Sequence, residues 1–318
     1  MHLMSVSGGL NVRSTFQQTL LAPVEIEGIG LHTGEVVRVR LVPAPVDSGI
    51  VFVRADLDGC PVVPAHYTHV VHTQMATTLG IGAARVSTVE HLLAALEGLH
   101  VDNLRIEVSG PELPILDGSS YGFLSAIESV GLERQTRRRK IVRLKRKVEL
   151  RVGEKWAVAE PCSHLEVRGT VEWDHPAIGF QEYTYIEGKT PFTELASART
   201  FGFLRDVEAL KRMGLIKGGS LENAVVLDSA CVLNPEGLRF ADEFARHKVL
   251  DALGDFKLAG VAIQMSVRLH RAGHDLHQQL LAEIFKNAEN FEPVEAPEDT
   301  REERRRSTVV AASAAAFV

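Results

Sequence analysis

The sequence predicts a protein of the α+β class with two domains, and three observations lead to that prediction. The chain has 318 residues, which exceeds the usual size of one compact domain. Residues 36–42 alternate apolar and polar side chains as half-buried strands do, whereas the apolar spacing of 88–97, which ends at Gly98, is typical of a helix. A basic stretch at 133–147 separates this first segment from a second one in which both patterns recur.

The second segment contains three strand-like runs, at 156–158, 165–173 and 224–227, and a strong helical pattern within 242–258. We therefore expect five parts along the chain. They are an N-terminal extension expected to be disordered (1–14), a first α+β domain (15–131), a linker (132–140), a second α+β domain (141–294) and a C-terminal tail expected to be disordered (295–318).

Composition and charge exclude several classes of protein. Hydrophobic residues make up 45% of the chain and charged residues 24%, as in an ordinary globular protein rather than a disordered or fibrous one. The 35 basic and 41 acidic residues give a net charge of −6, which is not the positive field of a non-specific nucleic-acid binder. The basic stretch also lacks interleaved aromatic side chains that could stack on bases, so a solvated linker is favoured over an RNA-binding patch.

Cysteine usage and hydropathy indicate a compartment. Cys60, Cys162 and Cys231 are far apart and outside any C-x-x-C spacing, which disfavours both a disulfide framework and a thiolate zinc site. No apolar run reaches about 18 residues, and the first residues lack a signal-peptide pattern. We expect a cytoplasmic protein without an integral membrane segment.

The helical pattern at 240–256 carries the first candidate chemistry. At 100° per residue, His247, Asp251 and Asp255 lie on one stripe, opposite an apolar face. An imidazole and a carboxylate one turn apart can bind one metal ion. The same spacing is equally compatible with a solvated polar face that carries an ion pair, and the helix by itself does not decide between these two interpretations.

A second candidate group opens the first predicted helix. His91 could supply a third metal ligand, and Glu90 beside it could face a water molecule, but Ser87 and Glu90 also have the spacing of a capping box. His274 follows Gly273, which could form a turn that directs the imidazole into a cleft; taken alone, such a histidine is more often an ordinary surface residue. Two histidines and one carboxylate form the ligand set of a catalytic zinc site, which here would have to assemble between the two domains.

Short motifs follow one another in order between about Thr19 and Leu281. They are GIGLHTG (28–34), STVEH (87–91), GPELPILDGS (110–119), ARTFGF (198–203), GGS (218–220), LRF (238–240), RHK (246–248), Asp251 and GH (273–274). Each motif is short, but their joint order along the chain is specific. Together they resemble the motifs of the UDP-3-O-acyl-N-acetylglucosamine deacetylase family of lipid A biosynthesis.

The resemblance implies a fold and a reaction. The fold would be two topologically related α+β domains, each a sheet with helices, with the helical layers packed face to face. A small sheet would be inserted in the first domain and a β-α-β unit, which forms the acyl-chain passage, in the second. The reaction would be the zinc-dependent hydrolysis of the N-acetyl group of UDP-3-O-(3-hydroxyacyl)-N-acetylglucosamine, which gives acetate and the free amine and is the committed step of lipid A biosynthesis.

The resemblance also implies roles for individual residues. It places Zn²⁺, with Fe²⁺ as an alternative, on His91, His247 and Asp251. It makes Glu90 the general base and His274 the general acid. The remaining residues would support these groups or bind substrate: Asp255 (support of His274), Thr200 (oxyanion hydrogen bond), and Lys248, Arg271, Gly273, Trp173, Phe201 and Phe203 (substrate binding).

Two other functions stay open at this point. A zinc peptidase or another amidohydrolase could use the same ligands on a different amide, and a nucleic-acid-binding protein could use the basic run at 137–147. For the deacetylase we expect the UDP-linked acyl sugar as partner, no nucleic acid, and a monomer.

Overall fold

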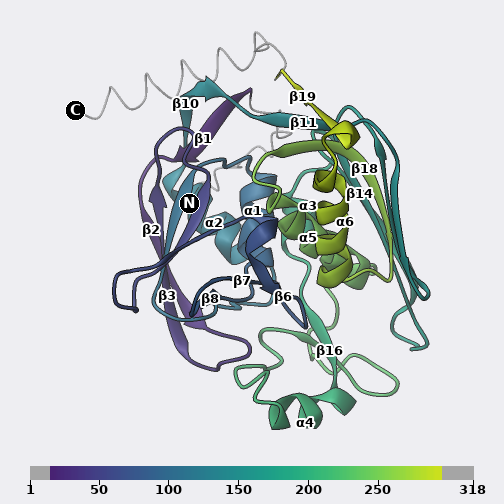
Figure 1. The fold of residues 1–318 in the computed structure, drawn as a ribbon. Coiled ribbons are helices and arrows are strands. Elements are labelled where there is room, and N and C mark those ends of the chain that lie inside the picture. Colours follow the sequence, from purple (N-terminus) through teal and green to yellow (C-terminus); the bar gives the residue numbers. More distant parts are fainter. Residues whose placement is uncertain (1–14, 296–318) are drawn as a thin grey trace, which may run out of the picture.

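The computed structural model describes residues 15–295, so the expectations for 1–14 and 296–318 lie outside the described residues. Two helices, α1 (Glu90–Gly98) and α5 (Glu243–Lys257), lie side by side in the middle of the molecule. A sheet lies on either side of this helical layer (Figure 1), which is the face-to-face arrangement of helices that was predicted.

The first half of the chain forms a five-stranded sheet in the order β2-β3-β9-β4-β5, covered by α1 and α2. A three-stranded sheet, β6-β7-β8, is inserted between β5 and α1. The bounds are β2 (Val24–Ile29), β3 (Val36–Pro43), β4 (Ile50–Arg54), β5 (Val62–Pro64), η1 (Tyr67–His69), β6 (Val70–His72), β7 (Thr78–Ile81), β8 (Ala84–Val86), β9 (Leu104–Val108) and α2 (Tyr121–Val130).

The second half forms a seven-stranded sheet in the order β12-β13-β18-β11-β19, with β14 pairing β18 and β15 pairing β14. A β-α-β unit, β16-α4-β17, protrudes below the helices in Figure 1. The bounds are β11 (Ile141–Leu144), β12 (Val148–Val152), β13 (Lys155–Pro161), β14 (Leu165–Trp173), β15 (Gly179–Ile186), α3 (Thr193–Ala196), β16 (Phe201–Phe203), α4 (Leu204–Arg212), β17 (Val225–Leu227), β18 (Ala262–His270), α6 (His274–Lys286), η2 (Ala288–Asn290) and β19 (Phe291–Val294).

The two large sheets share one pattern of pairing. Across β2-β3-β9-β4-β5 the pairs run antiparallel, antiparallel, parallel, antiparallel, and the same directions recur across β12-β13-β18-β11-β19. The strands in the fourth position enter at different points, since β4 follows β3 whereas β11 precedes β12. The α+β fold class is confirmed, and the division into two domains stays a prediction.

The expected linker is mostly a strand, so that prediction was wrong. Residues 132–138 form β10 (Leu132–Arg138), which pairs antiparallel with β1 (Phe16–Leu20). The basic side chains stand on an exposed edge, where Arg134 lies over the ring of Phe16, 3.8 Å from its centroid. Only Arg139 and Lys140 separate β10 from β11, and Arg139 is buried against Asp102.

The helix predicted from Thr88 begins two residues later, at Glu90. Thr88 has a φ of 57°, outside the helical region, and its hydroxyl donates to the buried carboxylate of Glu112. Where α1 meets α5, Gly254 leaves no room for a side chain, because a methyl group there would overlap the backbone carbonyl of Glu90. The two helices therefore approach to backbone contact at the residue that opens α1.

Candidate active site

Helix α5 is buried on both its apolar and its polar face. Val249 and Leu253 pack in the core, as the helical period predicts. The polar stripe is buried too, because α1 and α6 cover it: His247, Asp251 and Asp255 expose 1%, 2% and 3% of their surface. The interpretation of this stripe as a solvated polar face was therefore wrong, and a buried polar stripe requires partners.

His91, His247 and Asp251 meet at the contact of α1 with α5. One ligand atom of each lies within 4.8 Å of the other two. The Oδ1 atom of Asp251 lies 3.3 Å from Nε2 of His247 and 3.6 Å from Nε2 of His91. The sequence-predicted ligand set is thus assembled from two helices that are distant in the chain, one ending at Gly98 and the other beginning at Glu243.

This group has the properties of a metal site. Oδ1 of Asp251 is buried and accepts no hydrogen bond from any described residue, although such orphaned oxygens are rare. Nδ1 of His247 lies 3.1 Å from the carbonyl oxygen of Ala198, which can only accept, so Nδ1 carries the proton and Nε2 keeps a free lone pair. Burial lowers the pKa of His247 to about 3, which keeps the imidazole neutral as a metal ligand must be.

A second buried group lies beside the first and is satisfied by its own hydrogen bonds. Oδ2 of Asp255 lies 2.7 Å from Nδ1 of His274 and 2.8 Å from Nδ1 of His277. Its Oδ1 accepts from the hydroxyl of Thr77 at 2.6 Å. These residues also have metal-ligand spacing, but the hydrogen bonds already satisfy the carboxylate. Asp255 therefore orients His274 and leaves Nε2 of that ring facing Glu90, 3.7 Å from its Oε1.

Glu90 does not cap its helix. The N-cap residue is Val89, and no side chain caps it. The carboxylate of Glu90 instead accepts the backbone N–H of Thr77 at 3.1 Å, and the hydroxyl of Ser87 bonds that of Thr78. The capping-box interpretation was wrong because Glu90 is the first helical residue and its carboxylate turns away from the N-cap, into the site.

The charges of the site are set by burial and by opposite partners. Burial is the main cause that raises the pKa of Glu90 above its ordinary value, which favours a carboxylate able to accept a proton. Burial opposes the charge of His274 as well, but the carboxylates of Asp255 and Glu90 outweigh it and raise the pKa of His274 to about 10. Asp255 remains ionised: although burial raises its pKa, His274 and its hydrogen bonds lower that pKa to about 2.

Two of the expected substrate-binding residues, Phe201 and Lys248, lie next to this centre. Phe201 lies next to His247, with ring centroids 6.4 Å apart, and Trp173 and Phe203 continue an aromatic wall from it. The ammonium of Lys248 lies 2.9 Å from Oδ2 of Asp251 and 5.5 Å from the centroid of the Phe201 ring.

Three other expected site residues occupy different positions. Thr200 follows Arg199 on the segment that contacts α5, and its N–H donates to the carbonyl of Gly118. Gly273 is the N-cap of α6, next to His274. Arg271 is not brought into the centre, since its exposed guanidinium pairs with Glu154 at 2.7 Å.

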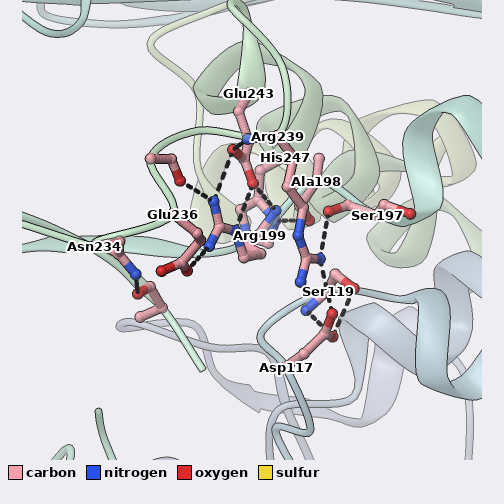
Figure 2. Close-up of polar contacts among 12 residues, drawn as sticks. Asp117, Ser119, Ser197, Ala198, Arg199, Asn234, Glu236, Arg239, Glu243 and His247 are labelled. Atoms are coloured by element: carbon pink, nitrogen blue, oxygen red, sulfur yellow. Dashed lines mark hydrogen bonds and ion pairs between the residues drawn. The ribbon is translucent and has the colours of Figure 1, made fainter. Parts of the chain in front are cut away.

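Reasoning from the sequence missed four residues of the centre: Thr77, which bonds both Glu90 and Asp255; His277; and Arg199 and Glu243, which form a pair next to His247 (Figure 2). A histidine three residues after His274, on the same helical face, was a readable signal for His277. Thr77 carried no such signal, because its contacts come from a loop before β7.

A buried pair of histidines and a carboxylate beside a second carboxylate and a charged imidazole is the equipment of a metal-dependent hydrolase. Residues 17–286 match the family described as LpxC: UDP-3-O-acyl N-acetylglycosamine deacetylase. The chain belongs to this family, which is a family of deacetylases.

Curated relatives support the same assignment over most of the chain. A UDP-3-O-acyl-N-acetylglucosamine deacetylase of Myxococcus xanthus is 45% identical over 281 residues, which are 88% of this chain and 90% of that protein. The protein of the same name from Acidithiobacillus ferrooxidans is 42% identical over 94% of this chain and 99% of its own length. That from Teredinibacter turnerae is 43% identical, with 89% and 94% covered. Within residues 15–295, no helix is long and apolar enough to cross a membrane.

Proposed function

We propose that this chain removes the acetyl group from the amide nitrogen of UDP-3-O-acyl-N-acetylglucosamine, the committed step of lipid A biosynthesis. The observation that carries the proposal is the buried group of His91, His247 and Asp251, with an unpaired carboxylate oxygen, beside the facing pair of Glu90 and His274. The names of the relatives supply the substrate.

His91, His247 and Asp251 would hold the metal ion. Two imidazoles and one carboxylate suit Zn²⁺ and leave a position free, and Fe²⁺ is the alternative for the same donor set. A bound ion of this kind supplies a Lewis acid that acidifies water and polarises the amide carbonyl.

The chain's own residues would carry the protons. Glu90 takes a proton from the attacking water as the oxygen–carbon bond forms, and the hydroxyl of Thr200 donates a hydrogen bond to the resulting oxyanion. Protonated His274 then gives the proton on Nε2 to the amide nitrogen as the carbon–nitrogen bond breaks, so that an amine rather than an amide anion leaves. Asp255 holds His274 in the charged form through Nδ1.

The remaining residues would bind the substrate. Trp173, Phe201 and Phe203 offer aromatic faces for the uracil ring and the start of the acyl chain, whose passage we place in the β-α-β unit. Lys248 and Gly273 stand close to the reacting groups. Arg271, at the rim, would have to leave Glu154 in order to reach a phosphate. A cytoplasmic location and a monomeric state stay predictions.

The test is acetate release by the purified, zinc-loaded chain from UDP-3-O-(3-hydroxyacyl)-N-acetylglucosamine, with the His247→Ala variant as control. We expect release by the wild-type chain, loss in the variant, and much slower release from N-acetylglucosamine that lacks the UDP and acyl groups. No release from the full substrate, or equal release from the truncated sugar, would refute the proposal.

A further inference from the structure

One peptide group is held at both of its ends by helix α5. The peptide bond between Ala198 and Arg199 presents its N–H to Oε1 of Glu243 at 3.0 Å and its carbonyl oxygen to Nδ1 of His247 at 3.1 Å. In a trans peptide these two groups point in opposite directions. Glu243 and His247 are four residues apart on α5, so one turn of the helix spans the peptide and bonds it on both sides (Figure 2).

The Glu243 end of this arrangement is built into a buried ionic network. The Glu243 side chain is fully buried, and it also accepts hydrogen bonds from the guanidinium of Arg199 at 2.9 Å and from the backbone N–H of Arg239 at 2.6 Å. The other side of the Arg199 guanidinium donates to Glu236 and to the carbonyl of Gly237, both at 2.7 Å. Both carboxylate oxygens of Glu243 are therefore held by hydrogen bonds, and the Ala198–Arg199 peptide cannot rotate without breaking them.

Stability alone does not explain this network. Replacing a buried ion pair by apolar residues of similar size is often neutral or even stabilising, so a buried pair is weak evidence for a role in stability. The network does, however, end at the carbonyl that selects the tautomer of His247. The other ring nitrogen of His247, Nε2, faces His91 and Asp251.

We infer that Arg199 and Glu243 are positioning residues for His247: they hold the Ala198–Arg199 peptide so that its carbonyl orients the imidazole and presents Nε2 to the metal ion. The inference rests on the proposed function for the metal site itself. The next residue is aligned by the same segment, since Thr200 continues from Arg199 and is bonded through its own N–H to Gly118 and through its carbonyl to Val225.

The experiment compares two double variants that both remove the buried charges. In Arg199→Met/Glu243→Gln the glutamine oxygen still accepts the peptide N–H, whereas in Arg199→Met/Glu243→Leu nothing does. We expect metal affinity, measured by competition with a chelator, to fall about 10- to 100-fold in the leucine variant and to stay within about threefold of wild type in the glutamine variant. The absorption spectrum of the Co²⁺-loaded protein should change only in the leucine variant. Glu236→Gln, which removes the negative charge of another Arg199 partner without touching the peptide, is the matched control and should bind metal as wild type does.

Equal metal affinities in the two double variants would overturn the inference, and so would an unchanged Co²⁺ spectrum in a folded leucine variant. His247→Ala separates this failure from that of the metal site: if His247→Ala loses metal and the leucine variant does not, only the positioning role is wrong.

A measurement on the wild-type chain does not depend on whether the variants fold. Because coupling is reciprocal, a peptide that favours metal binding must itself be held more firmly when metal is bound. We expect removal of the metal to speed hydrogen exchange at the amide of Arg199 at least tenfold and to leave the amide of Val158, in the interior of β13, unchanged. Equal exchange at Arg199 with and without metal would exclude the role.

Discussion

Glu90 and His274 face each other across the centre of the molecule, with Oε1 of the carboxylate 3.7 Å from Nε2 of the imidazole. One residue opens α1 and the other opens α6, so the pair joins the two halves of the chain. The carboxylate of Glu90, whose pKa is raised, suits the role of general base, and the imidazolium of His274 opposite suits that of general acid. This arrangement allows one proton to be taken from water and another to be given to a leaving amine within a few ångströms.

The first prediction concerns Glu90. Glu90→Gln keeps an oxygen that can accept the N–H of Thr77, but it cannot accept a proton, so turnover should fall by about 10²- to 10⁴-fold. The melting temperature and the metal content should stay near those of wild type. Ser87→Ala is the control and should keep its turnover, because the Ser87 hydroxyl bonds that of Thr78 and not the Glu90 carboxylate. A Glu90→Gln variant with near-normal acetate release would mean that another group is the base.

The second prediction concerns the basic limb of the pH profile. His274 acts in its protonated form, and its pKa is raised to about 10 by the net effect of Asp255 and Glu90 against burial. Turnover should therefore persist through neutral pH and fall as the pH approaches about 10. Asp255→Asn removes one of the charges that raise this pKa, so the limb should move to lower pH. A limb that stays in place in Asp255→Asn would argue against His274 as the acid.

The third prediction separates metal ligands from supporting residues. His91→Ala, His247→Ala and Asp251→Ala should each lose tightly bound metal, since each removes one of three ligands. Asp255→Ala should keep the metal but lose most of its turnover, because Asp255 bonds His274 instead. Metal content after dialysis and acetate release check both statements. Full metal occupancy in His247→Ala would remove the basis for the site.

The spacing of apolar residues was sufficient to predict a strand or a helix where the segment's own sequence determines its structure. The run 165–173 coincides with β14, and the helix predicted within 242–258 is α5 at 243–257. Helical period also places His247, Asp251 and Asp255 on one stripe. It could not show that this stripe is buried, because the covering helix, α1, comes from a distant part of the chain.

Elsewhere tertiary contacts overrode the local signal. Ser87 and Glu90 have the spacing of a capping box, but Thr88 leaves the helical region in order to reach the carboxylate of Glu112, and the helix begins too late for the box to form. The charged run at 132–138 resembles a linker because an exposed edge strand tolerates charge as a linker does. Its partner, β1, is more than 110 residues earlier.

The fourth prediction concerns a buried ion pair between the ends of α1 and α5. The ammonium of Lys257 lies 2.9 Å from Glu97. Burial would raise the pKa of Glu97, but the charges of Lys257, Arg139 and His100 lower it to about 2. Because the pKa of Glu97 is lower in the folded than in the unfolded chain, its ionised carboxylate stabilises the fold fully at pH values above 4.5, the ordinary pKa. This contribution is lost as the pH falls toward about 2.

Glu97→Gln should therefore cost about 3–5 kcal/mol of unfolding free energy at pH 7, because it leaves the ammonium buried without an opposite charge. Glu97→Gln/Lys257→Met should recover most of the loss and show a weaker decrease in stability between pH 4.5 and 2. Urea unfolding at several pH values measures both effects. If the single and double variants were equally stable, the pair would have no role in joining the two helices.

The contact at Gly254 makes the catalytic centre sensitive to a substitution at a residue that carries no functional group. The space there admits a hydrogen atom and excludes a methyl group, so the spacing of α1 and α5 is set by the absence of a side chain. All three metal ligands and the general base belong to these two helices. The methyl group of an alanine at this position would push Glu90 and His91 away from His274, His247 and Asp251. Activity would then be lost although every reactive residue is still present in the sequence.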